Sequence, residues 1–226
     1  MGYTHYFRAK KPITDTAWVK IKNDLTKLFN AHSILGERLY NDYLQKYIEK
    51  PEDMFCIIND VENSSDGKIY EAISVNGDRE LGLDHETFFI CKEDGGNQFN
   101  FTKTNRKPYD IFVAAAGVVI YNHAASSVEF SSDGGFGDEE WLDAISLLQA
   151  AFPKRKVKLP KFLGGKTVAE IAEEGLWPLS EIRIKNGMHD CLTQRCIAEK
   201  KAESQKNVPL EQLDGFEDLQ AGSLYF

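Results

Sequence analysis

The chain has 226 residues, of which 42% are hydrophobic and 27% are charged. This composition excludes a disordered or fibrous chain and is sufficient for one compact domain with a substantial core. Acidic residues outnumber Lys and Arg by 35 to 27, so the formal net charge is -8. That balance opposes broad, nonspecific nucleic-acid binding, which needs a basic surface. An acidic surface that mimics DNA stays open, although lysines interrupt the acidic residues throughout.

The sequence carries no clear targeting or metal signal. The N-terminal residues lack the apolar run of a signal peptide, and the longest apolar run, 111–121, is too short to span a membrane. The cysteines form no CxxC pair and have no histidine at zinc-site spacing (Cys56, Cys91, Cys191 and Cys196). We therefore expect a reduced, cytoplasmic protein without a bound metal.

The first elements along the chain are a strand and a helix. Residues 2–8 alternate aromatic and small polar side chains, which is the period of a strand. Pro12 and Thr14 then open a helix. Its apolar residues recur at spacings of three and four (Trp18, Ile21, Leu25, Leu28 and Phe29). Residues 35–47 fit either a second helix or a loop with a short turn.

From residue 54 the pattern changes to short strands rich in β-branched and aromatic residues. Asn, Asp and Gly residues, which suit tight reversals, separate these strands. We expect strands at 54–58, 68–75, 86–92 and 97–103. Because short turns join them, they form an antiparallel meander rather than a parallel βαβ sheet.

The strongest helix signal is at 108–122, where almost every residue is apolar, so we expect this helix to be buried against the sheet. A strand at 127–131 and an amphipathic helix at 138–151 follow. This order of elements predicts an α+β core domain at 1–153. In it, helices cover an antiparallel sheet, a meander of about five to six strands.

Two segments follow the core domain. Residues 154–166 are basic and interrupted by Pro and Gly, which is typical of a linker. Residues 167–226 predict a small helical C-terminal extension. It contains a short capped helix at 167–174, a longer polar helix at 188–206 and a loose tail.

The clearest candidate site is a cluster of cations between a strand and the buried helix. Lys103, Arg106 and Lys107 precede Pro108 and Tyr109, which begin the helix. Helix N-termini and adjacent Lys and Arg side chains bind phosphate or carboxylate, so this turn is a candidate anion site. The alternative is a solvated turn in which Arg106 pairs with a nearby carboxylate. The glycine pattern of a Walker loop is absent.

Histidines supply the other candidates. His85 and Glu86 are the candidate catalytic pair, since they could act as general base and acid, although a turn histidine with local hydrogen bonds has the same sequence. In the first strand, Tyr3 and His5 share one face. They could line a ligand pocket or be ordinary half-buried strand residues.

A glycine-rich segment at 131–138 lies between a strand and a helix. Backbone N–H groups in such a loop can cradle phosphate. Asp133 and Asp138 would repel an anion unless a Mg²⁺ ion intervened. A plain strand-to-helix connection capped by Asp138 explains the same residues.

Several of these segments together resemble a known family. The opening GYTHYF, the NG turn followed by HETF, the stretch KTNRKPYDIFVAA and the later SSDG are similar to an uncharacterised family of small proteins from tailed bacteriophages and prophages. The resemblance covers residues 1–150 and departs from the family's threonine-arginine-lysine-proline-tyrosine-aspartate run, because Asn105 precedes Arg106 here. It implies a phage accessory protein in the host cytoplasm, acting in host takeover or counter-defence. The family has no assigned catalytic residues, so the resemblance implies no residue roles.

Two functions from different classes are open at this stage. In the first, the protein binds or processes a small phosphorylated ligand such as a nucleotide. The cations of the turn hold the anion, Tyr109 and the Tyr and His side chains of the first strand contact the organic part, and His85 with Glu86 transfers a proton. This hypothesis requires the first strand to lie close to the start of the helix at 108–122.

In the second function, the protein is a non-enzymatic interaction module that inhibits a host protein. Enzyme activity and cofactor stay open. A DNA-binding accessory would need residues 154–166 and 103–107 to form one basic patch.

Overall fold

The computed structural model describes residues 3–59, 69–135 and 137–173, all within one compact unit of the chain, Met1–Met188. The strands are β1 (Thr4–Ala9), β2 (Tyr40–Asn41), β3 (Lys46–Tyr47), β4 (Phe55–Asn59), β5 (Ile69–Val75), β6 (Phe88–Cys91), β7 (Gln98–Lys103) and β8 (Val128–Ser132). The α-helices are α1 (Asp15–His32), α2 (Asp110–Ala124), α3 (Glu139–Ala151) and α4 (Val168–Ala172), and short 3-10 helices lie at Ser33–Leu35, Pro51–Met54 and Lys161–Leu163. Helices and antiparallel sheets are both present, which confirms the predicted α+β class. None of the helices in these residues is long and apolar enough to cross a bilayer.

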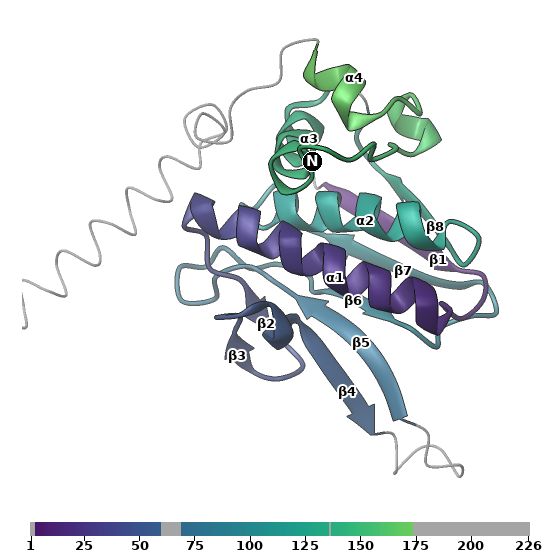
Figure 1. Cartoon of the computed structure of the whole chain (residues 1–226). Helices are drawn as coiled ribbons and strands as arrows, with labels where there is room; N and C mark the ends of the chain where they lie inside the picture. Colours follow the sequence, from purple (N-terminus) through teal and green to yellow (C-terminus); the bar gives the residue numbers. More distant parts are fainter. Residues whose placement is uncertain (1–2, 60–68, 136, 174–226) are drawn as a thin grey trace, which may run out of the picture. The chain divides into compact units, whose positions relative to one another are not determined.

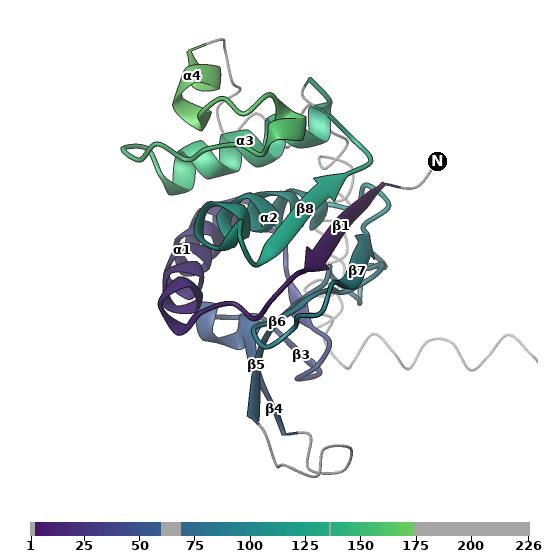
Figure 2. The same cartoon turned by 90° about the vertical axis from the view of Figure 1, so that its right-hand side faces the viewer.

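The described strands form two three-stranded antiparallel sheets and a short hairpin rather than one continuous ladder. One sheet has the order β4-β5-β6, which contains three strands of the expected meander. The expected single meander of five to six strands is wrong, because β7 pairs with β1 in the other sheet. The other has the order β7-β1-β8, so the N-terminal strand lies between two strands from later in the chain (Figure 2). The sheets meet where β6 approaches β7, and there the Thr102 hydroxyl donates to the Thr87 carbonyl at 3.4 Å.

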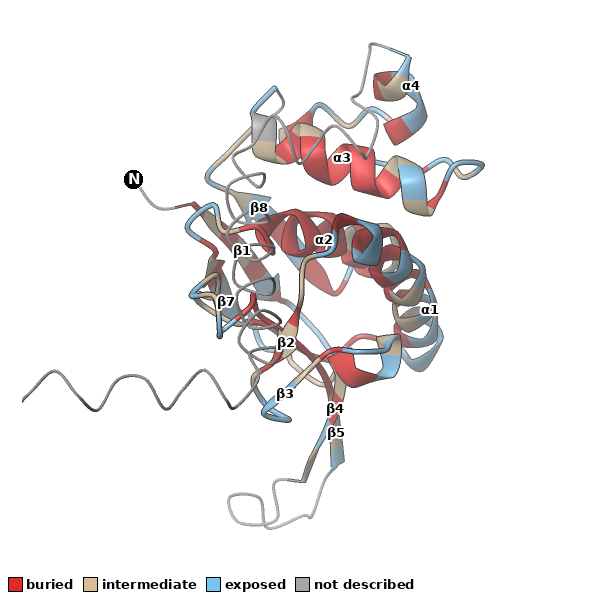
Figure 3. Ribbon diagram, turned by 90° about the vertical axis from the view of Figure 1, so that its left-hand side faces the viewer, coloured by how far each residue is buried: buried red, intermediate tan, exposed pale blue. Residues whose placement is uncertain are grey.

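The helix α2 lies at the centre of the core. It packs against β8 on one side and against α1 and α3 on the others (Figures 1 and 2). Every residue from Asp110 to Ile120 is buried, as the burial colouring along α2 shows (Figure 3). The prediction of a helix buried all round is therefore confirmed.

The helix α1 begins and packs as its sequence pattern indicates. The Thr14 side chain caps its N-terminus by accepting a hydrogen bond from the Ala17 N–H at 3.3 Å. Its apolar stripe is buried, with Ile21 and Leu25 fully covered. The Trp18 indole donates to Glu71 of β5 at 2.8 Å, so α1 also contacts the β4-β5-β6 sheet.

Gly117 of α2 lies against the Phe130 ring of β8, and we expect Gly117→Ala to destabilise the protein. A Cβ atom at this position would lie 2.2 Å from the Phe130 ring, which belongs to the buried face of β8. Overpacking costs about 1–3 kcal/mol and outweighs the gain of about 1 kcal/mol in helix propensity. Urea unfolding measures the change. In the double variant Gly117→Ala, Phe130→Ala, the loss of stability should be smaller than the sum of the losses in the two single variants. A Gly117→Ala protein as stable as the wild type would contradict this prediction.

The sequence leaves residues 35–47 open between a second helix and a loop with a short turn. In the structure their second half is the β2-β3 hairpin. The Asn41 side chain organises it. Its Oδ1 accepts the N–H groups of Tyr43 and Leu44 at 3.0 Å, and its Nδ2 donates to the Asp53 carbonyl at 2.7 Å. A side chain that satisfies the turn in this way mimics a backbone turn, which the pattern of tyrosines did not reveal.

The segment 154–166 does not behave as a linker. Val157, Leu159 and Leu163 are buried in the main core, and the Val168 N–H donates to the Val157 carbonyl at 2.8 Å. Alternate apolar residues among the lysines bring this basic segment onto the core, so the domain does not end at 153. The helix α4 falls within the predicted 167–174, whereas the helix predicted at 188–206 and the tail lie outside the described residues.

Candidate functional site

Segments that are far apart in the sequence meet at one end of the β7-β1-β8 sheet. They are the start of β1, the turn 103–107 after β7, the first turn of α2 and the loop 132–135 after β8. We call residues 103–107 the basic turn. The convergence brings most of the segments that the sequence singled out into one region of the fold.

A buried hydrogen bond joins β1 to the start of α2. The His5 Nε2 atom lies 2.8 Å from Oδ1 of Asp110, across 105 residues of sequence. The side chains are 0% and 3% exposed. Because an ionised carboxylate can only accept hydrogen bonds, this contact requires a proton on His5 Nε2. The first strand therefore lies against the helix N-terminus, as the ligand hypothesis requires.

This pair lies in a cluster of buried polar and aromatic side chains. The Thr104 hydroxyl also donates to Asp110 Oδ1. The Trp141 ring of α3 stands edge-on to His5 at 5.8 Å, and the Tyr3 ring lies 5.4 Å from His5. Burial raises the pKa of the Tyr3 hydroxyl well above its ordinary value, so it stays protonated. Tyr3 and His5 are core residues, which corrects the expectation that they contact a ligand directly.

The basic turn has an unusual backbone. Asn105 and Arg106 are consecutive non-glycine residues with φ of 54° and 57°, in the left-handed region that such residues rarely adopt. The N–H groups of Thr104 and Asn105 both donate to the Tyr3 carbonyl, at 2.9 and 3.3 Å. This turn carries the Arg106 guanidinium to 4.9 Å from the Tyr3 ring and into an ion pair with Glu140. The expected pairing of Arg106 with a carboxylate is therefore present, and 51% of its side chain stays exposed.

The two lysines of the basic turn are paired differently from Arg106. The Lys107 ammonium donates to the Gly82 carbonyl at 2.9 Å, which leaves its charge uncompensated. Within the described part of the chain, neither Lys103 nor Lys107 forms an ion pair with a carboxylate. The turn therefore presents net positive charge.

Hydrogen bonds through Glu86 connect Tyr109 to the basic turn. The Tyr109 side chain is 1% exposed, and its hydroxyl donates to the Glu86 carbonyl at 2.7 Å. The Glu86 carboxylate accepts the Lys103 N–H at 2.7 Å. Burial raises the pKa of Tyr109 far above its ordinary value. Tyr109 is therefore a core residue, which corrects the expectation that it contacts a ligand.

The proposed catalytic pair is not assembled in the structure. His85 is exposed, and its backbone N–H donates to Asn76 Oδ1 at 3.1 Å. Its imidazole makes no hydrogen bond to any described residue, Glu86 included. The carboxylate of Glu86 is instead bound to the backbone of β7. These contacts fit the alternative of a turn histidine with local hydrogen bonds.

The glycine-rich loop closes the same end of the sheet. A Cβ atom on Gly134 would lie 2.0 Å from the Tyr3 hydroxyl, so only glycine fits this close approach. The Gly135 N–H donates to Asp138 Oδ2 at 2.7 Å, and Asp133 accepts the Tyr6 hydroxyl at 2.6 Å. Such contacts favour the strand-to-helix connection. In the part of the chain that the structure describes, no three His, Cys, Asp or Glu side chains are grouped to hold a metal ion.

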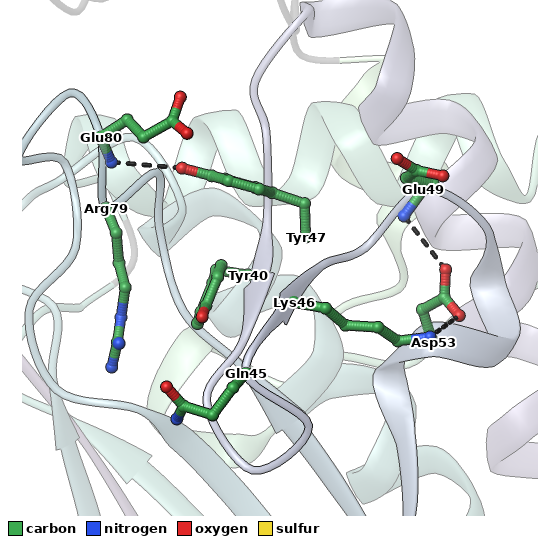
Figure 4. Close-up of a pocket in the computed structure, with 8 residues that line it drawn as sticks. All are labelled: Tyr40, Gln45, Lys46, Tyr47, Glu49, Asp53, Arg79 and Glu80. Atoms are coloured by element: carbon green, nitrogen blue, oxygen red, sulfur yellow. Dashed lines mark hydrogen bonds and ion pairs between the residues drawn. The ribbon is translucent and has the colours of Figure 1, made fainter.

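A cavity of about 620 Å³ lies elsewhere, beside the β2-β3 hairpin (Figure 4). Two tyrosine rings form part of its wall, Tyr40 and Tyr47, with their centroids 5.1 Å apart. The Arg79 guanidinium lies 4.6 Å from the Tyr40 ring. The lining consists of Tyr40, Gln45, Lys46, Tyr47, Glu49, Asp53, Arg79 and Glu80.

The cations of this cavity are already paired. Lys46 lies 2.5 Å from Asp53, and Arg79 lies 2.5 Å from Asp42. Because carboxylates compensate both charges, the cavity has no preference for an anion. The unpaired lysines of the basic turn offer the better site for one.

The sequence pattern did not indicate that a group of aromatic residues is exposed. Phe99 and Phe101 of β7 are 49% and 53% exposed, on the sheet face that α2 does not cover. Tyr6 of β1 lies on the same face, opposite Phe101. The alternation in QFNFTK places both phenylalanines on one face of a strand, but it does not say whether that face is buried.

Comparisons with known proteins leave the chain without an assigned family. No protein-family model matches it, and no curated protein or solved structure matches it significantly. The function is therefore inferred from the geometry of the chain itself.

Proposed function

We propose that the protein binds a small phosphorylated ligand, such as a nucleotide, at the basic turn. The observation that carries the proposal is the strained pair Asn105–Arg106, whose left-handed backbone costs free energy and is held by buried residues. Strain of this kind persists where a side chain must point in a set direction. Here that side chain is the guanidinium of Arg106, which Tyr3 and Glu140 hold in place.

The three cations have complementary roles in this proposal. Arg106 offers a planar fork of donors that fits two phosphate oxygens. Lys103 and Lys107 supply charge without a carboxylate to compensate it. The buried His5–Asp110 pair and Tyr109 fix the backbone beneath the turn and do not touch the ligand.

We expect the double variant Lys103→Gln, Lys107→Gln to bind a nucleotide at least tenfold more weakly than the wild type, because two charge-assisted contacts are lost. Calorimetric titration with ATP, GTP and inorganic phosphate measures the affinity, and a rise in melting temperature reports binding independently. Lys11→Gln, Lys20→Gln is the matched control, since both lysines are exposed and lie outside the turn.

The control should bind as tightly as the wild type. The proposal is rejected if none of these ligands binds the wild type at millimolar concentration. It is also rejected if the control loses as much affinity as the variant of the turn, because the attraction would then be a general effect of charge.

A further inference from the structure

The outer face of the β7-β1-β8 sheet has an exposed row of aromatic rings. In β7 the residues on this face are Phe99, Phe101 and Lys103, and the register places them opposite Arg8, Tyr6 and Thr4 of β1. On the opposite face of the sheet, His5 and Phe7 of β1 and Thr102 of β7 are buried, whereas Gln98 at the start of β7 is exposed. The two phenylalanines of β7 therefore face outward. An exposed apolar patch of this kind marks an interaction site.

The rings form a nearly parallel array. Tyr6 and Phe99 are stacked, with centroids 6.0 Å apart and ring planes 18° from parallel. The Phe99 and Phe101 centroids are 6.2 Å apart at 35°. Phe99 and Phe101 are about half exposed, so neighbouring aromatic side chains are accessible on this face, and such side chains can stack on planar bases.

Cations lie at both ends of the row. Lys103 follows Phe101 on the same face, and the Arg8 guanidinium lies 5.4 Å from the Phe99 ring. Lys10 continues the face beyond Arg8 and lies 2.5 Å from Glu129 at the β8 edge. Arg8 also lies 4.0 Å from Glu129, so this one carboxylate offsets part of the charge of Arg8 and Lys10 at the β8 side. Cations therefore still outnumber carboxylates around the rings.

The composition of the face indicates its occupant. Its side chains are Thr4, Tyr6, Arg8, Phe99, Phe101, Lys103, Glu129 and Ser131. None is a large aliphatic residue, so the apolar surface of this face consists of aromatic rings. Rings for stacking, with cations at their ends, complement a chain that alternates bases and phosphates.

We propose that this face binds a short segment of single-stranded nucleic acid, with bases stacked on Tyr6, Phe99 and Phe101 and phosphates near Arg8 and Lys103. The site goes beyond the ligand proposed for the basic turn, because none of its three rings takes part there, although the two sites share Lys103. Binding of nucleic acid at this face is also compatible with the acidic net charge of the protein. Binding that depends on stacking and on a few phosphates has a shallow salt dependence, unlike binding through an extended basic surface.

Fluorescence anisotropy with labelled oligonucleotides of about eight nucleotides tests this inference on the full chain. We expect single-stranded DNA or RNA to bind, and duplex DNA of the same sequence to bind more weakly. Phe99→Ala, Phe101→Ala should lower the affinity about tenfold or more, because two stacking surfaces are lost. Phe99→Tyr, Phe101→Tyr should retain binding.

The control is Ile57→Ala, Ile69→Ala, which removes two similarly exposed apolar side chains from β4 and β5. The inference is overturned if the alanine variant of β7 binds like the wild type, if duplex binds as well as single strand, or if no oligonucleotide binds at low salt. Self-association that the β7 variant abolishes, without any oligonucleotide binding, would overturn it in favour of a second copy of the chain. Titration of the β7 variant with free nucleotide separates this site from the basic turn, where binding should be unchanged.

Discussion

Replacing Asp110 with alanine is expected to lower the free energy of unfolding by about 3–5 kcal/mol, which is the usual cost of removing one partner from a buried pair. The carboxylate accepts hydrogen bonds from His5 Nε2 and from the Thr104 hydroxyl, and all three side chains are buried. The alanine would leave both donors without a partner, and each unsatisfied buried group carries its own penalty. Urea unfolding at neutral pH measures the loss.

Asp110→Asn is the matched control, because the carbonyl oxygen of a side chain of the same shape can still accept both hydrogen bonds. It should cost clearly less than the alanine. The double variant His5→Ala, Asp110→Ala should cost less than the sum of the single variants, since the interaction between them is lost only once. A change below about 0.5 kcal/mol for Asp110→Ala would show that this pair does not hold β1 to α2.

The second large effect is expected at Asp24, which lies on α1 and is 5% exposed. His123 of α2 contacts its carboxylate at 2.6 Å, and Arg155 forms an ion pair with it. Asp24→Asn should cost about 2–3 kcal/mol at neutral pH, somewhat less than a fully buried pair because Arg155 is partly solvated. Thermal or urea unfolding across a range of pH is the measurement.

The contribution of Asp24 to the free energy of unfolding should depend on pH. Burial alone would raise the pKa of Asp24, but hydrogen bonds with His123 and Arg155 outweigh burial and hold the pKa below its ordinary value of 3.8. The folded state therefore binds this proton less readily than the unfolded state. Asp24 contributes stability that is present above pH 3.8 and is lost as the pH falls through the lower, folded-state pKa. The difference between wild type and Asp24→Asn should narrow in acid, and a constant difference would contradict the assignment.

Local sequence patterns predicted most of the regular elements because their causes are local. The stripe around Trp18 and the Thr14 cap define α1, and the unbroken apolar run defines α2. Strand pairing depends on contacts that the local pattern does not contain. No local signal states that β1 pairs with β7 and β8, and this pairing decides that Phe99 and Phe101 face outward.

The candidate site was predicted in its charge but not in its geometry. Three cations before a helix are visible in the sequence, and so is their opportunity to bind an anion. The burial of Tyr3, His5 and Tyr109 is not visible, because aromatic and histidine side chains occur both inside and on the surface. The left-handed backbone at Asn105 and Arg106 also comes from tertiary contacts, since neither residue is glycine.

The central place of β1 has a consequence for the order in which the protein is made. Its side chains reach across 105 residues to Asp110 and across 127 residues to Asp133. At the usual pace of translation, roughly 6–25 s pass before the last of these partners follows β1 out of the ribosome. During that interval β1 lacks the strands that later flank it. Its pairing in the β7-β1-β8 sheet can be completed only after β8, the last of the described strands, has been made.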